Sequence, residues 1–335
     1  MGAVHGVYLK YVGLSAISFC GYHMMVGTIG PMDPLIPLSL TSLSLSSLAA
    51  VDDTRTLLLT TSIDTNSSGS NGLLSLLRLG LASILGYSTL INGAIAILFK
   101  LRRGMSLVGK NRTNGTIPLW SYVILFPFHI PTVAYTYIHT KYGTMNKPFS
   151  SDTHTINEDT PQAAKTTTTT TTTKVEKITV PVASEVQPGW WVGGCYSNRL
   201  NKHWAGVVDC TVEFPERCRT VQYLCLPTWD GVPATPEQLD KAAKFCIDAI
   251  EEWNRLRKTG LVEGEPNILI HCAHGRGRST TVMCAALVKM GYFASYEEAL
   301  VMGIQPSRPC CKLNKMMKTN LAEWQRIYMD GKKDS

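Results

Sequence analysis

The sequence NILIHCAHGRGRSTTVMCAALVKM, residues 267–290, decides the fold of the C-terminal half. Its start, Asn267–His271, is a short apolar run, which is typical of a strand buried in a sheet. Residues Ser279–Met290 are mostly apolar and are followed by Gly291, which predicts a helix that ends there. A loop with two glycines joins the two. The order of strand, glycine-rich loop and helix therefore indicates a layered α/β domain.

Strand and helix patterns alternate on both sides of this stretch. Thr235 stands before Pro236 and Glu237, an N-cap, a first-turn proline and an early acid that predict a helix through about Lys258. The other predicted elements are strands at Trp190–Gly193, Gly206–Thr211 and Thr220–Leu226 and helices at Ser295–Gly303 and Cys311–Tyr328. We therefore expect a central, mostly parallel sheet flanked by helices over residues 185–330.

The loop from Cys272 to Arg278 has the residue types that hold and attack a phosphate. Its glycines let the backbone turn N–H groups inward as an anion-binding nest, and the next helix points its positive end there. The guanidinium of Arg278 can bind two phosphate oxygens at once. These surroundings favour the nucleophilic thiolate of Cys272. The predicted phosphate-binding residues are Ala273, His274, Gly275, Arg276, Gly277 and Arg278, with His271 in support.

By the pattern His-Cys-x5-Arg-Ser at residues 271–279, the chain resembles the dual-specificity branch of the protein tyrosine phosphatase superfamily. The resemblance covers residues 185–328 and includes Gly189–Gly194 and Ser307–Pro309. It implies a phosphocysteine intermediate on Cys272, phosphate binding by Arg278, and a hydroxyl of Ser279 that assists departure of the thiolate. It also implies a mechanism without a metal or another cofactor.

The resemblance further implies a carboxylic acid on a separate loop, which protonates the leaving oxygen and then activates water. Asp230, in the sequence LPTWDG at 226–231, follows a predicted strand and precedes a glycine, so it is the first candidate. Asp209 and Glu213 are alternatives. A simple Asp-Gly turn is the other interpretation of Asp230.

Three functions are compatible with this motif. The first is hydrolysis of phosphotyrosine, phosphoserine or phosphothreonine in proteins. The second is hydrolysis of a phosphoinositide or another phospholipid, because His274 and Arg276 add positive charge to the rim, as in lipid phosphatases of the superfamily. The third, of another class, is an inactive phosphate-binding scaffold at a membrane.

Residues 1–145 have the pattern of an α-helical, membrane-associated region. Residues 73–99 are long and apolar enough for a main span, and residues 7–26 and 117–138 are further possible spans. A basic cluster directly follows the main span, and this indicates juxtamembrane charge on the cytosolic side rather than a nucleic-acid site. Its members are Lys100, Arg102, Arg103, Lys110 and Arg112.

The Thr-rich residues 146–184 have no apolar period, so we expect a disordered linker there. The ten cysteines include no Cys-x-x-Cys spacing and suggest no zinc site, which fits the reducing compartment that a catalytic thiol needs. A full crossing by residues 117–138 would remove the catalytic domain from the cytosol. We therefore expect this proline-containing segment at the membrane interface and the catalytic domain facing the cytosol.

Overall fold

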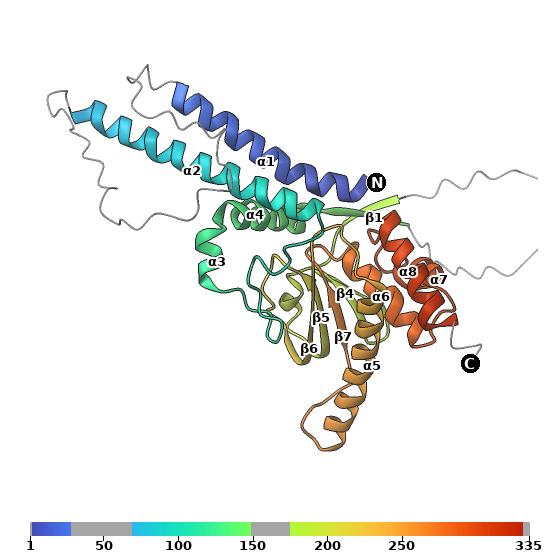
Figure 1. The fold of residues 1–335 in the computed structure, drawn as a ribbon. Coiled ribbons are helices and arrows are strands. Elements are labelled where there is room, and N and C mark those ends of the chain that lie inside the picture. Colours follow the sequence, from blue (N-terminus) through green and yellow to red (C-terminus); the bar gives the residue numbers. More distant parts are fainter. Residues whose placement is uncertain (1, 28–68, 149–174, 331–335) are drawn as a thin grey trace, which may run out of the picture. The chain divides into compact units, whose positions relative to one another are not determined.

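The computed structural model describes residues 2–27, 69–148 and 175–330 (Figure 1). The chain divides into two compact units, which are treated separately here. Residues 11–94 form the smaller unit, and residues 1–10 together with 95–335 form the larger one. The threonine run at 166–173 lies outside the described residues.

Two helices, α1 (Gly2–Gly27) and α2 (Gly69–Lys100), supply the smaller unit. They pack closely at small side chains, since the Ser15 hydroxyl donates to the carbonyl of Thr89 at 3.0 Å. Within the described residues, one helix is long and apolar enough to cross a membrane, and it covers Leu73–Lys100. This range agrees with the main span expected from the sequence.

The proline-containing segment at residues 117–138, expected at the membrane interface, contains two helices. Helix α3 (Leu119–Ile124) ends at Leu125, and α4 (Phe126–Tyr142) starts at once in another direction. The Ser121 hydroxyl lies 3.1 Å from Nε2 of His129, which ties α3 to α4. Both helices belong to the larger unit, and Phe128 is fully buried in it.

The rest of the larger unit alternates strands and helices, as the sequence predicts. The strands are β1 (Thr144–Pro148), β2 (Val175–Thr179), β3 (Ala183–Gln187), β4 (Trp190–Gly193), β5 (His203–Thr211), β6 (Arg219–Thr228) and β7 (Ile268–His271). The helices are η1 (Ser197–Leu200), α5 (Pro236–Lys258), α6 (Arg278–Lys289), α7 (Tyr296–Glu298), η2 (Ala299–Ile304) and α8 (Lys315–Tyr328). Helix α5 starts where predicted, because Thr235 and Gln238 form a reciprocal capping box.

The central sheet has five strands in the order β3-β4-β7-β5-β6. All neighbours are parallel except β3 and β4, which are antiparallel at one edge. The expected mostly parallel α/β sheet is therefore confirmed. Strand β7 lies at the centre, so it delivers the Cys272 loop to the middle of the carboxyl edge, where sites of parallel sheets form.

Successive residues of β5 face opposite sides of this sheet. Val208 points into the main core, which α5, α6 and α8 cover in Figure 1. Val207 points to the other side, where it packs with Trp204 and Leu269. Both strand faces are buried, which explains the continuous apolar runs in the sequence.

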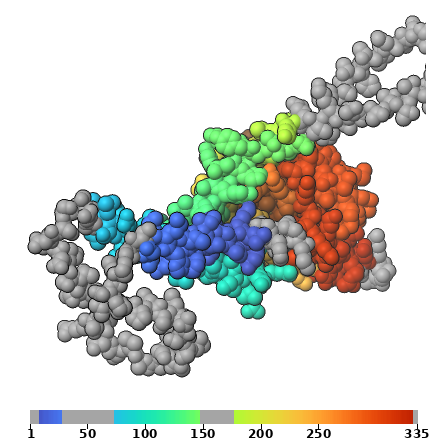
Figure 2. Space-filling view, turned by 90° about the horizontal axis from the view of Figure 1, so that it is seen from above, coloured from blue at the N-terminus to red at the C-terminus, as the bar shows by residue number. Residues whose placement is uncertain are grey.

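Of the predicted linker at 146–184, the structure describes residues 146–148 and 175–184. The two ends of the 146–184 stretch are paired, since β1 and β2 form an antiparallel two-stranded sheet. The compact unit that contains the Cys272 loop comprises residues 1–10 and 95–335, and the boundary near residue 185 stays a prediction. In Figure 2 the green residues of this N-terminal part lie directly against the orange and red C-terminal part.

Candidate active site

The Cys272 loop is folded as an anion-binding nest. Gly275 has a φ of +67°, and a Cβ there would lie 2.6 Å from the backbone of Gly193, so a side chain is excluded. The buried Arg308 accounts for the direction of the loop peptides. Its guanidinium donates to the carbonyls of Gly275 (2.8 Å) and His274 (3.1 Å), which turns these oxygens outward. The N–H of Gly275 then points inward and lies 3.3 Å from the Cys272 sulfur.

Cys272 itself is buried at the floor of the loop. Burial opposes ionisation of its thiol, but the charge of Arg278 and hydrogen bonds from Ser279 lower its pKa below the ordinary value. The Ser279 hydroxyl lies 3.4 Å from Sγ. The geometry therefore favours a thiolate in contact with the hydroxyl that the resemblance assigns to its departure.

Arg278 is held by a buried carboxylate. Its Nη2 donates to Oε1 of Glu213 at 2.6 Å, and its Nη1 donates to the carbonyl of Thr228 at 2.6 Å. The Nε atom is buried and has no partner among the described residues, so it can donate to a bound phosphate. Glu213, an alternative acid in the sequence analysis, is bonded to Arg278 and is not among the residues that line the pocket of Cys272.

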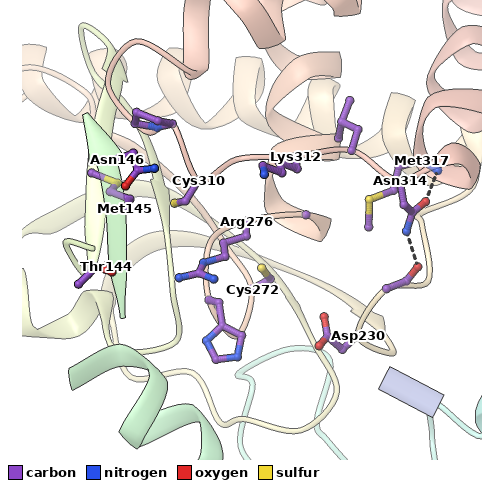
Figure 3. A pocket seen from close by; sticks show the side chains of 15 residues that line it. Thr144, Met145, Asn146, Asp230, Cys272, Arg276, Cys310, Lys312, Asn314 and Met317 are labelled. Atoms are coloured by element: carbon purple, nitrogen blue, oxygen red, sulfur yellow. Dashed lines mark hydrogen bonds between the residues drawn. The ribbon is translucent and has the colours of Figure 1, made fainter. Parts of the chain in front are cut away.

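Asp230, the first candidate for the acid, is partly exposed and lies close to Arg278. It lines the same pocket as Cys272, of about 680 Å³, and its side chain is 38 % exposed. One of its carboxylate oxygens lies 3.6 Å from Nη2 of Arg278. In Figure 3 it lies toward the side of Asn314 and Met317, with Cys272 in the middle of the group.

The pocket also has lining residues that the sequence analysis missed. One of them is Lys312, which lies at the rim beside the expected Arg276 and donates from its main-chain N–H to the carbonyl of Arg276 at 2.9 Å. Strand β1 contributes further lining, although it precedes the Thr-rich stretch and carries no catalytic pattern. Those residues are Thr144, Met145 and Asn146.

The expected positive charge on His274 is wrong. Burial, the neighbouring His139 and the charge of Arg276 lower the pKa of His274 to about 3, so its ring is neutral at pH 7. The rings of His274 and His139 lie 4.9 Å apart between centroids. Arg276 and Lys312 therefore carry the positive charge of the rim.

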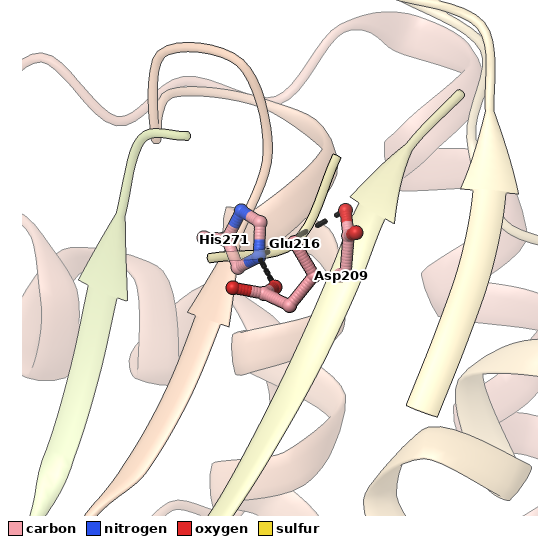
Figure 4. A group of neighbouring side chains, drawn as sticks. All are labelled: Asp209, Glu216 and His271. Carbon is pink, nitrogen blue, oxygen red and sulfur yellow. Dashed lines mark hydrogen bonds and ion pairs between the residues drawn. The ribbon is translucent and has the colours of Figure 1, made fainter. Parts of the chain in front are cut away.

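A buried charge network lies beneath the loop (Figure 4). Nε2 of His271 lies 2.6 Å from Glu216 and 3.8 Å from Asp209. Burial alone would lower the pKa of His271, but these two carboxylates raise it to about 9. Asp209 also forms an ion pair with Lys110, whose side chain is 1 % exposed. Asp209, the other alternative acid, is thus buried and paired with a lysine.

Asp209, Glu216 and His271 also form a group with metal-ligand atoms close together. Two cations already compensate its two carboxylates, since Lys110 pairs with Asp209 and the protonated His271 pairs with Glu216. A protonated imidazole cannot bind a metal through the same nitrogen. Cations of the chain itself therefore compensate both carboxylates of this group.

No protein-family model and no curated protein matches the chain. Among solved structures, human DUSP28 matches at 19% identity over 44% of this chain and 94% of its own, with a TM-score of 0.35. PTPMT1 matches at 20% identity over 46% and 99%, with a TM-score of 0.35. The human tyrosine phosphatase-like serine/threonine/tyrosine-interacting protein matches at 20% identity over 44% and 97%, with a TM-score of 0.35.

Proposed function

We propose that the chain is a cysteine-dependent phosphatase that hydrolyses phosphate monoesters. The observation that carries the proposal is the arrangement of Cys272, Arg278 and Asp230. The thiol of Cys272, whose pKa is lowered, lies at the floor of its loop next to the buried guanidinium of Arg278. The partly exposed carboxyl of Asp230 lines the same pocket. This combination supplies a nucleophile, a phosphate ligand and an acid.

In the first step, the thiolate of Cys272 attacks phosphorus and forms a P–S bond. The P–O bond to the leaving group breaks, and Asp230 gives its proton to the departing oxygen. Arg278 and the inward N–H groups of the loop stabilise the charge on the phosphoryl oxygens.

In the second step, the carboxylate of Asp230 takes a proton from water as the water oxygen bonds to phosphorus. The P–S bond breaks, and inorganic phosphate and the Cys272 thiolate leave the intermediate. The Ser279 hydroxyl, 3.4 Å from the sulfur, stabilises the thiolate as it departs.

We propose a phosphorylated protein as substrate, with phosphate on tyrosine, serine or threonine. A phospholipid head group is the second candidate, favoured by Arg276 and Lys312 at the rim and by the apolar helix Leu73–Lys100. Both substrate classes present a phosphate monoester to the same nest. They differ in what surrounds the ester, so a substrate panel separates them.

The test is phosphate release by the full-length protein in detergent micelles, wild type beside Asp230→Asn. The panel contains an aryl phosphate, phosphotyrosine and phosphothreonine peptides, and phosphoinositides in mixed micelles. We expect activity in the wild type and a loss of about 10²- to 10⁴-fold in Asp230→Asn, the range for a general acid. A folded wild type that binds phosphate but releases none from any substrate would favour the inactive scaffold.

We further propose that the protein is membrane-anchored through Leu73–Lys100, with the catalytic unit in the cytosol. All ten cysteines are free thiols, as a reducing compartment allows. Protease added to sealed microsomes should digest the catalytic unit. A fragment that stays protected until detergent is added would contradict this orientation.

A further inference from the structure

The side chain next to Asp230 is held by the N-terminal part of the chain. Trp229 is 1 % exposed, and its indole N–H donates to the carbonyl of Arg103 at 2.8 Å. Its ring lies 5.9 Å from the ring of Phe128, edge to face at 90°, and 6.3 Å from that of Phe99. The polar and the apolar contacts of Trp229 therefore both reach residues more than one hundred positions earlier in the chain.

The carbonyl of Arg103 is fixed by the end of helix α2. Arg102 has a φ of +54° and donates from its N–H to Phe99, while the N–H of Arg103 donates to Leu98 at 2.9 Å. These two bonds and the left-handed residue form a Schellman motif, which terminates a helix in a defined geometry. Trp229 is thus bonded to the terminus of the helix that is apolar enough to cross a membrane.

On the other side, the acid loop is held by the catalytic part. The Asn314 side chain donates to the carbonyl of Gly231 at 3.0 Å. The N–H of Val232 donates to the carbonyl of Trp229, which closes a turn around Asp230. The carboxyl of Asp230 lies between these two anchors. The carboxyl of Asp230 lies 3.6 Å from the guanidinium of Arg278, which also binds Glu213. The backbone at Trp229 and Gly231 therefore sets where Asp230 points.

We infer that the end of helix α2 and the start of helix α4 position the general acid, Asp230. Trp229 is the positioning residue, because it contacts Phe99, Arg103 and Phe128 and directly precedes Asp230. The inference rests on the proposed function of Asp230. It makes the chain segment that leaves the membrane helix a working part of the active site. A displacement of about 1 Å at a catalytic group can cost about 10²-fold in rate, so a loosened anchor has a measurable effect.

The choice of leaving group separates positioning from simple stability. An acidic phenol leaves as its anion with little help, whereas a weakly acidic phenol needs a proton from Asp230. The experiment measures kcat for a series of aryl phosphates with phenols of decreasing acidity, using full-length protein in detergent micelles. Trp229→Phe keeps the ring but removes the N–H that bonds to Arg103.

We expect Trp229→Phe to lose about ten- to a hundredfold on the least acidic phenol and little on the most acidic one. In an Asp230→Asn background the same substitution should add almost nothing, because both changes act through one group. Trp253→Phe is the matched control, since it also removes a buried indole bond, 3.1 Å long, to the carbonyl of Gly264. It should leave the leaving-group dependence as in the wild type.

Phe128→Leu provides a second variant if Trp229→Phe fails to fold. It should also lower kcat more on the least acidic phenol than on the most acidic one. An equal loss on every phenol, or an undiminished loss in the Asp230→Asn background, would overturn the inference while leaving the phosphatase intact. A folded wild type without activity, or one indifferent to Asp230→Asn, would instead overturn the proposed function and with it the inference.

Discussion

Replacement of Cys272 by serine should abolish phosphate release on every substrate. A serine hydroxyl in the same place stays protonated near neutral pH, whereas the pKa of the Cys272 thiol is lowered by Arg278 and Ser279 against the effect of burial. Loss of a covalent nucleophile typically costs about 10⁴-fold or more in kcat. The measurement is single-turnover phosphate release, together with mass spectrometry of acid-quenched protein, in which the wild type should carry a phosphoryl group on Cys272.

Cys310 is the matched control because it lines the same pocket. A hydrogen bond with Cys311 lowers the pKa of Cys310, so a reactive thiol alone does not identify the nucleophile. Cys310→Ser should keep most of the activity. Activity that persists in Cys272→Ser but disappears in Cys310→Ser would show that Cys310, and not Cys272, is the nucleophile.

The hydrogen bond between Ser279 and Cys272 predicts how the activity depends on pH. The Ser279 hydrogen bond lowers the pKa of Cys272, so Ser279→Ala should raise that pKa. Because the thiolate is the reactive form, the acidic limb of kcat/KM should then move to higher pH. An unchanged limb would mean that another group sets it.

Local features of the fold were predictable from the sequence because they depend on neighbouring residues. The strand, loop and helix around Cys272 follow from an apolar run, two glycines and a second apolar run. Helix α5 follows from Thr235 and Pro236, and its observed bounds are Pro236–Lys258. The roles of Cys272 and Asp230 stay predictions, although the structure places both on one pocket.

Features that depend on distant pairing were not predictable. Lys110 belongs to a basic cluster after an apolar run, a pattern that indicates juxtamembrane charge, yet its side chain is buried against Asp209, 99 residues later. Trp229 likewise shows no local sign of its bond to Arg103, 126 residues earlier. The charge of His274 was misjudged because its neutrality depends on burial and on His139. A single sequence contains no signal for such contacts.

Replacement of Lys110 by methionine should strongly destabilise the larger unit. The Lys110 ammonium donates to Asp209 and to both the carbonyl and the hydroxyl of Thr211, at 2.9 and 3.0 Å. Methionine has similar bulk but leaves Asp209 buried without its cation. Removal of one partner of a buried ion pair typically costs about 3–5 kcal/mol. For a unit of this size that corresponds to a fall of about 10 °C in Tm, measured by tryptophan fluorescence of the full-length protein in detergent micelles.

The double variant Lys110→Met with Asp209→Asn tests whether the charge itself is responsible. An asparagine keeps the oxygen that accepts from Thr211 and removes the uncompensated charge, so most of the lost Tm should return. Lys241→Met, at an exposed position of α5, is the control and should change Tm little. An equal Tm for wild type and Lys110→Met would show that Asp209 does not need this cation. A fall in Tm would instead show that the unit containing the Cys272 loop depends on residue 110, far before the predicted boundary at 185. The physical reason is that Lys110, from the segment that follows the apolar helix, neutralises the buried carboxylate of Asp209.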